Sequence, residues 1–182
     1  MTKDKFHNSI VLQQEQADCG IACLLSIIKY YGGEATFEYI RKLSGTNTLG
    51  TTLLGLYQAA NSLGFNAEGC EADIANLINH PKPVILHVLI EDKLEHYLVC
   101  YGAKFNENKE LVFIIGDPSR GIIYLNESEL LIIWKSRICL TLEPNDSFEL
   151  KTDIKLKKRL WIKELIKEAK QFRQKGFDLE KN

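Results

Sequence analysis

A cysteine, a histidine and an aspartate stand in this sequence where they could carry out acyl transfer. Cys19 follows a polar run and begins an apolar segment with helical spacing, so we expect it at the N-terminus of a helix. There the unpaired backbone N–H groups and the helix dipole favour the nucleophilic thiolate. Gly20 follows it and would leave room for a substrate backbone near the sulfur. His96 and Asp117 lie beside apolar runs downstream and could serve as base and orienting acid.

His96 is the preferred base among the four histidines. It begins an apolar strand beside a charged turn, whereas His87 lies inside the most apolar strand, where a neutral core histidine is the common arrangement. We expect no chemistry from His7, near the N-terminus, or from His80, in a proline-rich turn. Asp117 precedes a proline, which favours an extended backbone and can aim its carboxylate, although an ordinary Asp-Pro turn would also explain the pair.

The other four cysteines are predicted to be apolar filler. Cys23 lies one helical turn after Cys19, Cys100 and Cys139 alternate with apolar residues, and Cys70 shows no reactive context. A zinc site needs repeated, closely spaced ligand pairs, and only Cys19 and Cys23 approach that spacing. No Cys-x-x-Cys redox motif is present. The sequence therefore predicts neither a metal nor a cofactor.

Helical patterns fill the first part of the chain and strand patterns the second. The helices are expected over residues 19–31, 37–43 and 53–63, with Thr36 and either Thr51 or Thr52 as N-caps. Strand patterns cover residues 83–89, 96–101, 111–115, 122–124 and 137–142, with a short helix from Asn126 through Trp134 between the last two. This order predicts an α+β fold, a helical N-terminal half packed on an antiparallel sheet, with the site at the seam between them.

Composition limits the class of protein. The 182 residues, 45% hydrophobic, suffice for one domain with a real core, and we expect a domain over residues 1–148 and a tail over residues 149–182. A formal net charge of −1 argues against nucleic-acid binding. Five cysteines without a signal peptide favour a reducing, cytosolic compartment, and no apolar run approaches the roughly 20 residues that span a bilayer.

The tail has a different composition from the domain. Residues 155–175 are rich in lysine and arginine, with Trp161 and several leucines and isoleucines at helical spacing. Such a basic amphipathic helix can lie on an anionic membrane surface or pack on a partner. A plain solvated helix is the alternative interpretation.

Together these motifs resemble the bacteriocin-processing, double-glycine leader peptidase family, a papain-like family. The resemblance covers residues 9–143 and rests on Gln13, five intervening residues and Cys19-Gly20, on His96-Tyr97 and Asp117-Pro118, and on the segments Gly50–Leu56 and Gly64-Phe65. Members usually form the cytosolic N-terminal domain of peptidase-containing ABC transporters. The resemblance implies that Cys19 is the nucleophile, His96 the general base and acid, Asp117 its orienting residue and Gln13 the oxyanion-hole side chain.

The resemblance also implies partners. It predicts a cysteine endopeptidase that cuts a precursor leader after Gly-Gly, Gly-Ala or Gly-Ser, at the cytoplasmic face of the bacterial inner membrane. Peptide secretion would use ATP-binding and membrane domains of an ABC transporter, in the same chain or a separate one. Leu54 and Tyr57 are candidates for the groove that binds the leader, although core packing is the more frequent role of such side chains.

Two other functions share these features. A docking domain would bind secreted substrates without cutting them, but such degenerate domains in the family lack the cysteine that this chain keeps. A cysteine acyltransferase would use the same nucleophile and base and would pass the acyl group to an amine rather than to water.

Overall fold

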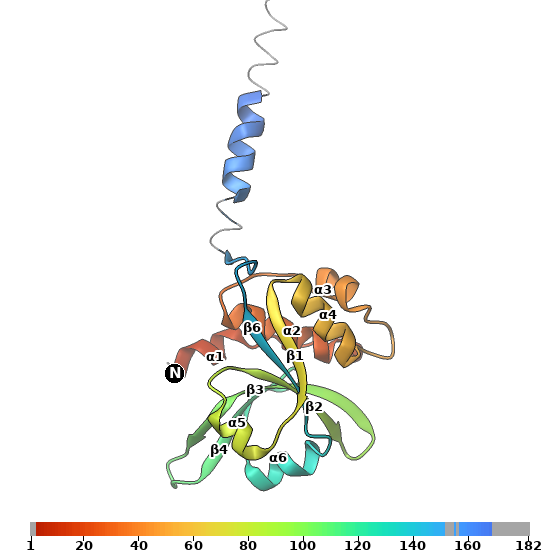
Figure 1. Cartoon of the computed structure of the whole chain (residues 1–182), viewed down its shortest axis with the longest axis vertical. Coiled ribbons are helices and arrows are strands. Elements are labelled where there is room, and N and C mark those ends of the chain that lie inside the picture. Colours follow the sequence, from red (N-terminus) through yellow and green to blue (C-terminus); the bar gives the residue numbers. More distant parts are fainter. Residues whose placement is uncertain (1–2, 152–154, 156, 169–182) are drawn as a thin grey trace, which may run out of the picture. The chain divides into compact units, whose positions relative to one another are not determined.

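The structure, a computed structural model, describes residues 3–151, 155 and 157–168. The chain divides into two compact units, Met1–Phe148 and Glu149–Asn182. The first unit contains a helical N-terminal part followed by a sheet with two further short helices (Figure 1). Its elements are, in chain order, α1 (Lys3–Ser9), the 3-10 turn η1 (Gln16–Asp18), α2 (Cys19–Tyr30), α3 (Phe37–Ser44), α4 (Leu53–Ser62), β1 (Phe65–Glu71), α5 (Ile74–Asn79), β2 (Val84–Ile90), β3 (Leu94–Phe105), β4 (Leu111–Asp117), β5 (Gly121–Asn126), α6 (Glu127–Ile133) and β6 (Ile138–Pro144).

The six strands form one sheet in the order β1-β6-β2-β3-β4-β5, and every adjacent pair is antiparallel. Strands β3 and β4 position the two predicted polar residues of the site. Val99 pairs with Gly116, so His96 near the start of β3 and Asp117 at the end of β4 come to the same end of the sheet. Register therefore brings together residues that the sequence separates.

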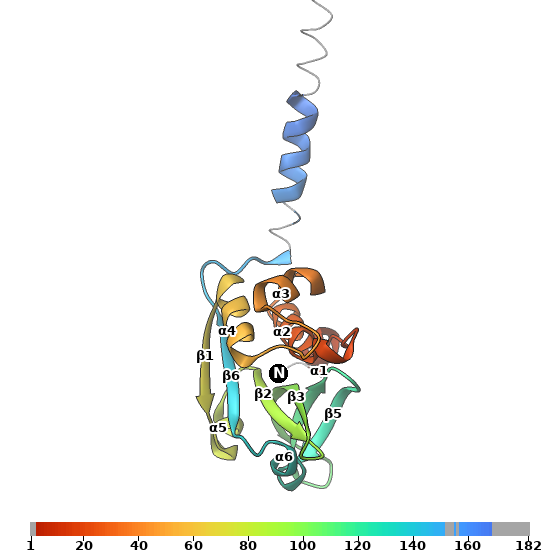
Figure 2. The same cartoon turned by 90° about the vertical axis from the view of Figure 1, so that its right-hand side faces the viewer.

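Helices cover both faces of this sheet. Figures 1 and 2 show α1 to α4 on one side and α5 with α6 on the other. A core cluster lies on each face. The first cluster joins α2 and α4 to one face of the sheet. The second joins α5 and α6 to the opposite face. The prediction of an α+β fold with a helical N-terminal half on an antiparallel sheet is thus confirmed.

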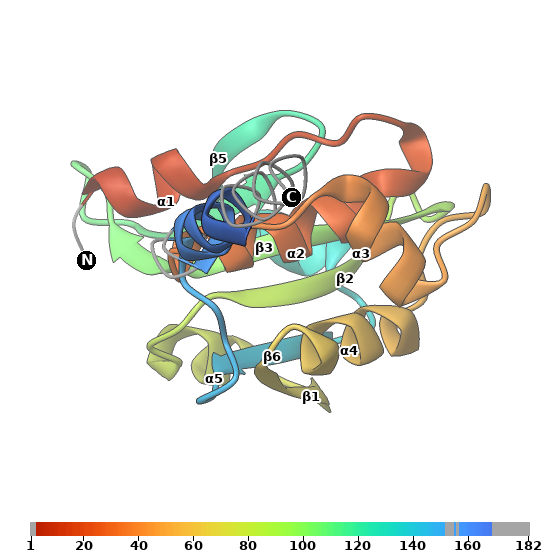
Figure 3. The same ribbon diagram turned by 90° about the horizontal axis from the view of Figure 1, so that it is seen from above.

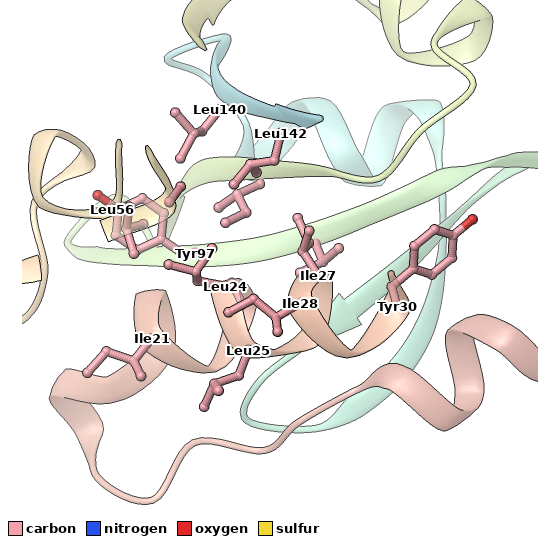
Figure 4. Packing of buried hydrophobic residues seen from close by; sticks show 14 of the residues in the cluster. Ile21, Leu24, Leu25, Ile27, Ile28, Tyr30, Leu56, Tyr97, Leu140 and Leu142 are labelled. Atoms are coloured by element: carbon pink, nitrogen blue, oxygen red, sulfur yellow. The ribbon is translucent and has the colours of Figure 1, made fainter. Parts of the chain in front are cut away.

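Helix α2 is the centre of the first cluster. Ile21, Leu24 and Ile27 recur every three residues and have no exposed surface, so this face of the helix is fully covered. The helix packs across β3 (Figure 3). Its buried side chains belong to one cluster with Leu56 of α4 and Leu140 of β6, part of which Figure 4 shows. A helix buried to this degree holds its first residue in a fixed place.

The predicted helix starts are confirmed in detail. The side chains of Thr36, Thr52 and Asn126 accept hydrogen bonds from backbone N–H groups in the first turns of α3, α4 and α6. The predicted strands are all present, although β3 continues past its predicted end through a bulge. Gly102, with φ of +120°, allows the chain to make that bulge.

Three short elements, α1, β1 and α5, do not follow from the sequence patterns. Strand β1 has the sequence FNAEGCE, which lacks the apolar alternation of a half-buried strand. It is an edge strand whose main chain pairs with β6 over its whole length. Helix α5 has only six residues, too few for a periodic pattern to be recognised.

The second unit contains a helix over residues 157–168, whose side chains are exposed. Trp161, Ile162, Leu165 and Ile166 fall on one side of it by helical spacing. Residue 156 and residues 169–175 of the predicted basic helix lie outside the described part of the chain. Among the described residues, no helix combines the length and apolar character that crossing a bilayer requires.

Candidate active site

Cys19 is the first residue of α2, as predicted, and only 7% of its surface is exposed. Gly20, the next residue, is closely surrounded within the protein. A Cβ at Gly20 would lie 3.2 Å from Thr51 Cβ, 3.2 Å from Tyr97 Cδ2 and 3.3 Å from Leu56 Cδ1. Such short distances show that the N-terminus of α2 packs closely against α4 and β3.

His96 and Asp117 form the polar pair beside this helix end. His96 Nε2 lies 3.1 Å from Asp117 Oδ1, and Cys19 lies near enough to help raise the pKa of His96. The sequence suggested a base near a surface edge, but His96 is only 7% exposed. The three predicted catalytic side chains therefore meet in a largely buried position.

Asp117 is held by more donors than His96 alone. Its Oδ1 accepts hydrogen bonds from the Ser119 backbone N–H at 2.8 Å and the Ser119 hydroxyl at 2.7 Å. Its Oδ2 accepts one from Arg120 Nε at 2.7 Å. Sequence reasoning missed Ser119 and Arg120; the signal was an aspartate followed two residues later by serine, an Asx-turn pattern.

These contacts shift the pKa values of the pair in opposite directions. Burial by itself would lower the pKa of His96, but its hydrogen bonds with Asp117 and Cys19 outweigh burial and raise the pKa to about 9. Burial would raise the pKa of Asp117, but the hydrogen bonds from His96, Ser119 and Arg120 hold it well below its usual range. At neutral pH the site thus holds an ionised carboxylate beside a protonated imidazole.

Gln13 lies on the segment that leads into η1 and lines the same hollow as His96 and Asp117. Its backbone N–H donates to the Pro118 carbonyl at 2.9 Å, which ties this segment to the end of β4. Its side-chain Oε1 is buried and has no hydrogen-bond partner within the described residues. The Gln13 amide, with its oxygen unpaired, thus lies beside His96 and Asp117.

A second carboxylate lies immediately before Cys19 in the sequence. Asp18 is 1% exposed, and its two oxygens receive Arg41 Nη2 at 2.8 and 3.0 Å. Its Oδ2 also accepts a hydrogen bond from the Glu15 backbone N–H at 3.2 Å. This pair connects η1 to α3 and fixes the turn between Gln13 and Cys19. The sequence patterns do not predict it.

Two hollows flank the site. One of about 220 Å³ is lined by Gln13, His96 and Asp117, and the other of about 450 Å³ by Tyr97 and neighbouring residues. Glu95 lines both, so they adjoin beside the catalytic pair. The larger hollow also includes His87, which was expected in the core, and Gly50, Thr51 and Thr52 before α4.

Leu54 and Tyr57 are surface residues of α4. They are 63% and 41% exposed, so core packing, the more frequent role, does not apply to them. Leu49, in the loop before α4, is 95% exposed and lines the larger hollow. No sequence pattern indicates this third exposed apolar side chain, because its exposure depends on the path of the loop.

Cys23 lies one turn after Cys19 on the same helix, but its surroundings differ. It is 1% exposed, and burial followed by the nearby Cys19 and Asp117 raises its pKa well above the usual range. Its prediction as core filler is confirmed. The same holds for Cys100 and Cys139, whereas Cys70 is only half-buried.

Comparison with known proteins shows which family and which relatives this chain matches. The model of the family described as Peptidase C39 family matches residues 7–147. Pediocin PA-1 transport/processing ATP-binding protein PedD of Pediococcus acidilactici is 42% identical over 120 residues, which are 65% of this chain and 16% of that protein. Lactococcin-G-processing and transport ATP-binding protein LagD of Lactococcus lactis is 37% identical over 127 residues, 69% of this chain and 17% of that protein.

Solved structures agree with this match. The peptidase domain of Streptococcus ComA, a bi-functional ABC transporter involved in a quorum sensing pathway, has a TM-score of 0.68 at 35% identity, covering 76% of this chain and 100% of that one. A double glycine motif protease from an AMS/PCAT transporter, in complex with the leader peptide, has a TM-score of 0.65 at 26% identity, covering 75% and 91%. The chain spans about one-sixth of the length of the two curated relatives above.

Proposed function

The chain belongs to the peptidase C39 family, a cysteine peptidase class, and from that premise we propose that it removes the leader from a secreted precursor peptide. Cleavage would follow a Gly-Gly, Gly-Ala or Gly-Ser end. The observation that carries this proposal is the buried pair of His96 and Asp117, with Cys19 near enough to help raise the pKa of His96. That arrangement supports a nucleophile with its acid-base partner and orienting carboxylate.

Each side chain has a role in the proposed reaction. The Cys19 sulfur bonds to the carbonyl carbon after the second small residue, and the carbonyl oxygen becomes an oxyanion. The amide N–H of Gln13 and a backbone N–H near Cys19 stabilise that charge. His96 gives its proton to the leaving amine as the peptide bond breaks, which leaves a thioester. His96 then takes a proton from water, which attacks the thioester and frees Cys19.

Protonation of His96 at the start supports this sequence. Its pKa of about 9 means that the ring holds a proton at neutral pH and can donate it to the departing amine. Asp117, ionised across that range, keeps the ring oriented. The acid step therefore needs no prior proton uptake.

Exposed apolar side chains beside the larger hollow support a docking place for the leader. Leu54 and Tyr57 project from α4, and Thr51 and Thr52 before them line the hollow. An amphipathic leader helix would bury its apolar face there while its small C-terminal residues enter beside Cys19. Tyr57→Ala should then raise KM with little change in kcat. Gln58→Ala, also exposed on α4, is the matched control.

The relatives support a transporter context. Because these relatives are transport and processing ATP-binding proteins, we infer that this domain works with the membrane and nucleotide-binding domains of an ABC exporter, in the same chain or a separate one, at the cytoplasmic face of the membrane. The helix over residues 157–168, with five basic and two acidic residues, would lie on anionic lipid. Trp161 fluorescence should shift to the blue with phosphatidylglycerol vesicles and stay unchanged with phosphatidylcholine vesicles.

The deciding test is mass spectrometry of a leader-bearing peptide ending in Gly-Gly, incubated with wild type, Cys19→Ala and Cys23→Ala. We expect one cut after the second glycine by wild type and Cys23→Ala and none by Cys19→Ala. Cys23 is the matched control because it lies on the same helix and is buried. Binding without cleavage by all three proteins would indicate a docking domain, and an acyl adduct on an added amine would indicate a transferase.

A further inference from the structure

Two cysteines outside the site face each other across neighbouring strands. Cys70 of β1 pairs in register with Cys139 of β6, and their sulfur atoms are 3.3 Å apart. Directly opposed residues of an antiparallel pair have Cα atoms about 4.5–5.5 Å apart, within the roughly 4.4–6.8 Å that disulfides span. The backbone therefore already holds these thiols at cross-linking distance.

The pair lies on the sheet face opposite the nucleophile. Cys139 belongs to the core cluster formed with α6, and Cys70 packs against that cluster. Cys19 belongs to the other cluster, with α2. Cys100 shares the face of the pair, but its sulfur is directed to the Gly102 carbonyl at 4.0 Å. The sheet thus separates the paired thiols from the catalytic one.

The two thiols differ in access. Cys139 is 1% exposed, whereas Cys70 is half-buried on an edge strand. A reagent from solution therefore reaches Cys70 first. Burial and the hydrogen bond with Cys70 raise the pKa of Cys139, which disfavours its thiolate and its role as the first nucleophile. This asymmetry gives one entering thiol and one resolving thiol.

We propose that Cys70 and Cys139 are a site of oxidative cross-linking that accepts a low-molecular-weight disulfide as oxidant. The Cys70 thiolate attacks one sulfur of the reagent, a mixed disulfide forms, and the first small thiolate leaves and takes up the proton lost by Cys70. Cys139 then loses its proton and attacks the Cys70 sulfur, and the second small thiolate leaves and takes up that proton. Two electrons pass from the protein to the reagent, which ends as two small thiols.

The cross-link would reinforce the strand at the edge of the sheet. Strand β1 lies at the sheet edge and pairs with β6, and α4 packs on it. A bond between residues 69 positions apart restricts the unfolded chain strongly and ties β1 to the sheet in the folded state. The expected consequence is a rise in Tm of about 5 °C or more.

The test uses the full chain carrying Cys19→Ala, so that the catalytic thiol cannot compete. After incubation with oxidised glutathione, the remaining thiols are alkylated, and peptides are mapped by mass spectrometry alongside a thermal melt. We expect one cross-link, joining the peptides of Cys70 and Cys139, and a raised Tm that dithiothreitol reverses. Adding Cys100→Ser should change neither result, because that thiol lies on the same face but outside the pair.

Further variants separate the two roles. Adding Cys70→Ser should abolish both the cross-link and the rise in Tm. Adding Cys139→Ala should instead trap glutathione on Cys70, because the resolving thiol is gone. Stable glutathione on Cys70 while Cys139 is present, a cross-link between another pair, or a cross-link without a rise in Tm would overturn the proposal.

Discussion

Two aspartate–arginine pairs hold the two halves of the site. Asp18, 1% exposed, pairs with Arg41 next to the nucleophile, and Asp117, 2% exposed, pairs with Arg120 next to the base. The arginines are partly open to solvent, with 35% and 59% of their side chains exposed. By residue type and burial, the two pairs look alike.

The pairs differ in what else each carboxylate touches. Asp117 presents Oδ1 to His96, so its charge acts directly on the ring that would transfer the proton in the proposed reaction. The carboxylate of Asp18 contacts Arg41 and the Glu15 backbone N–H, so it shapes the turn before Cys19. We therefore expect one pair to take part in the chemistry and the other to hold the local structure. Substitutions should separate these roles.

The largest effect is expected from Asp117→Ala. Without the carboxylate, the His96 ring loses its orienting partner and the charge that keeps it protonated. We expect kcat/KM to fall about 1,000-fold, within the range of general acid-base catalysis. Single-turnover cleavage of a Gly-Gly leader peptide measures this. Asp18→Ala, the matched change in the other pair, should lose far less activity; equal losses would remove the distinction between the pairs.

Asp117→Asn tests the role of the Asp117 charge through the pH dependence of kcat/KM. Wild-type kcat/KM should hold up to about pH 9 and fall above it, because His96 then loses the proton that it must donate. The asparagine side chain can still accept from His96 but carries no charge, so the pKa of His96 falls and the alkaline limb moves to lower pH. An unmoved limb would mean that another group sets it.

Gln13→Ala should have the next largest effect. Gln13 is linked to both pairs. Its backbone N–H donates to the carbonyl of Pro118, the residue after Asp117, and the segment that follows it is fixed by the hydrogen bond from the Glu15 backbone N–H to Asp18. Loss of one oxyanion donor should lower kcat about a hundredfold while folding and leader binding stay normal. Wild-type turnover would exclude the side chain from the mechanism. A raised KM with unchanged kcat would assign it to binding instead.

Arg41→Met should act mainly on stability. It leaves the Asp18 carboxylate buried with one backbone donor, and we expect Tm to fall by about 5 °C while kcat/KM changes by less than about tenfold. Adding Asp18→Asn removes the unpaired charge and should recover part of the lost Tm. Calorimetry of the single and double variants measures this, and a further fall in the double variant would contradict it.

Sequence patterns anticipated much of this fold because its helices and inner strands are periodic and well capped. Thr36 and Asn126 are recognisable caps, and buried strands such as β2 are apolar runs. The edge strand β1 could not be predicted, because main-chain pairing with β6 holds it and its side chains show no alternation.

The proposed site, like the fold, could be predicted only in part. Cys19, His96 and Asp117 could be chosen by their local sequence, but their meeting depends on the register of β3 with β4 and on how α2 crosses the sheet. Asp18 and Arg41 were missed because they are 23 positions apart, and nothing local shows that both belong to one pair. Contacts between distant segments are what sequence periodicity leaves out.

The smallest effect is expected from Arg120→Met. Arg120 is largely exposed and solvent screens its charge, so we expect a loss of about 2 °C in Tm at pH 7. Activity should stay within about threefold of wild type, because His96 and Ser119 keep Asp117 ionised.

The pH dependence of this loss tests its cause. The folded pKa of Asp117 lies below its ordinary value of 3.8, so the contribution of Asp117 to stability is present above that pH and is lost as the pH falls through the folded pKa. Without Arg120 that pKa rises, so the difference in Tm between wild type and variant should be full at pH 7 and smaller at about pH 2, where the carboxyl of the variant takes up a proton before that of the wild type. Calorimetry at both values decides this, and a difference that does not change with pH would show that Arg120 acts through packing rather than through the carboxylate.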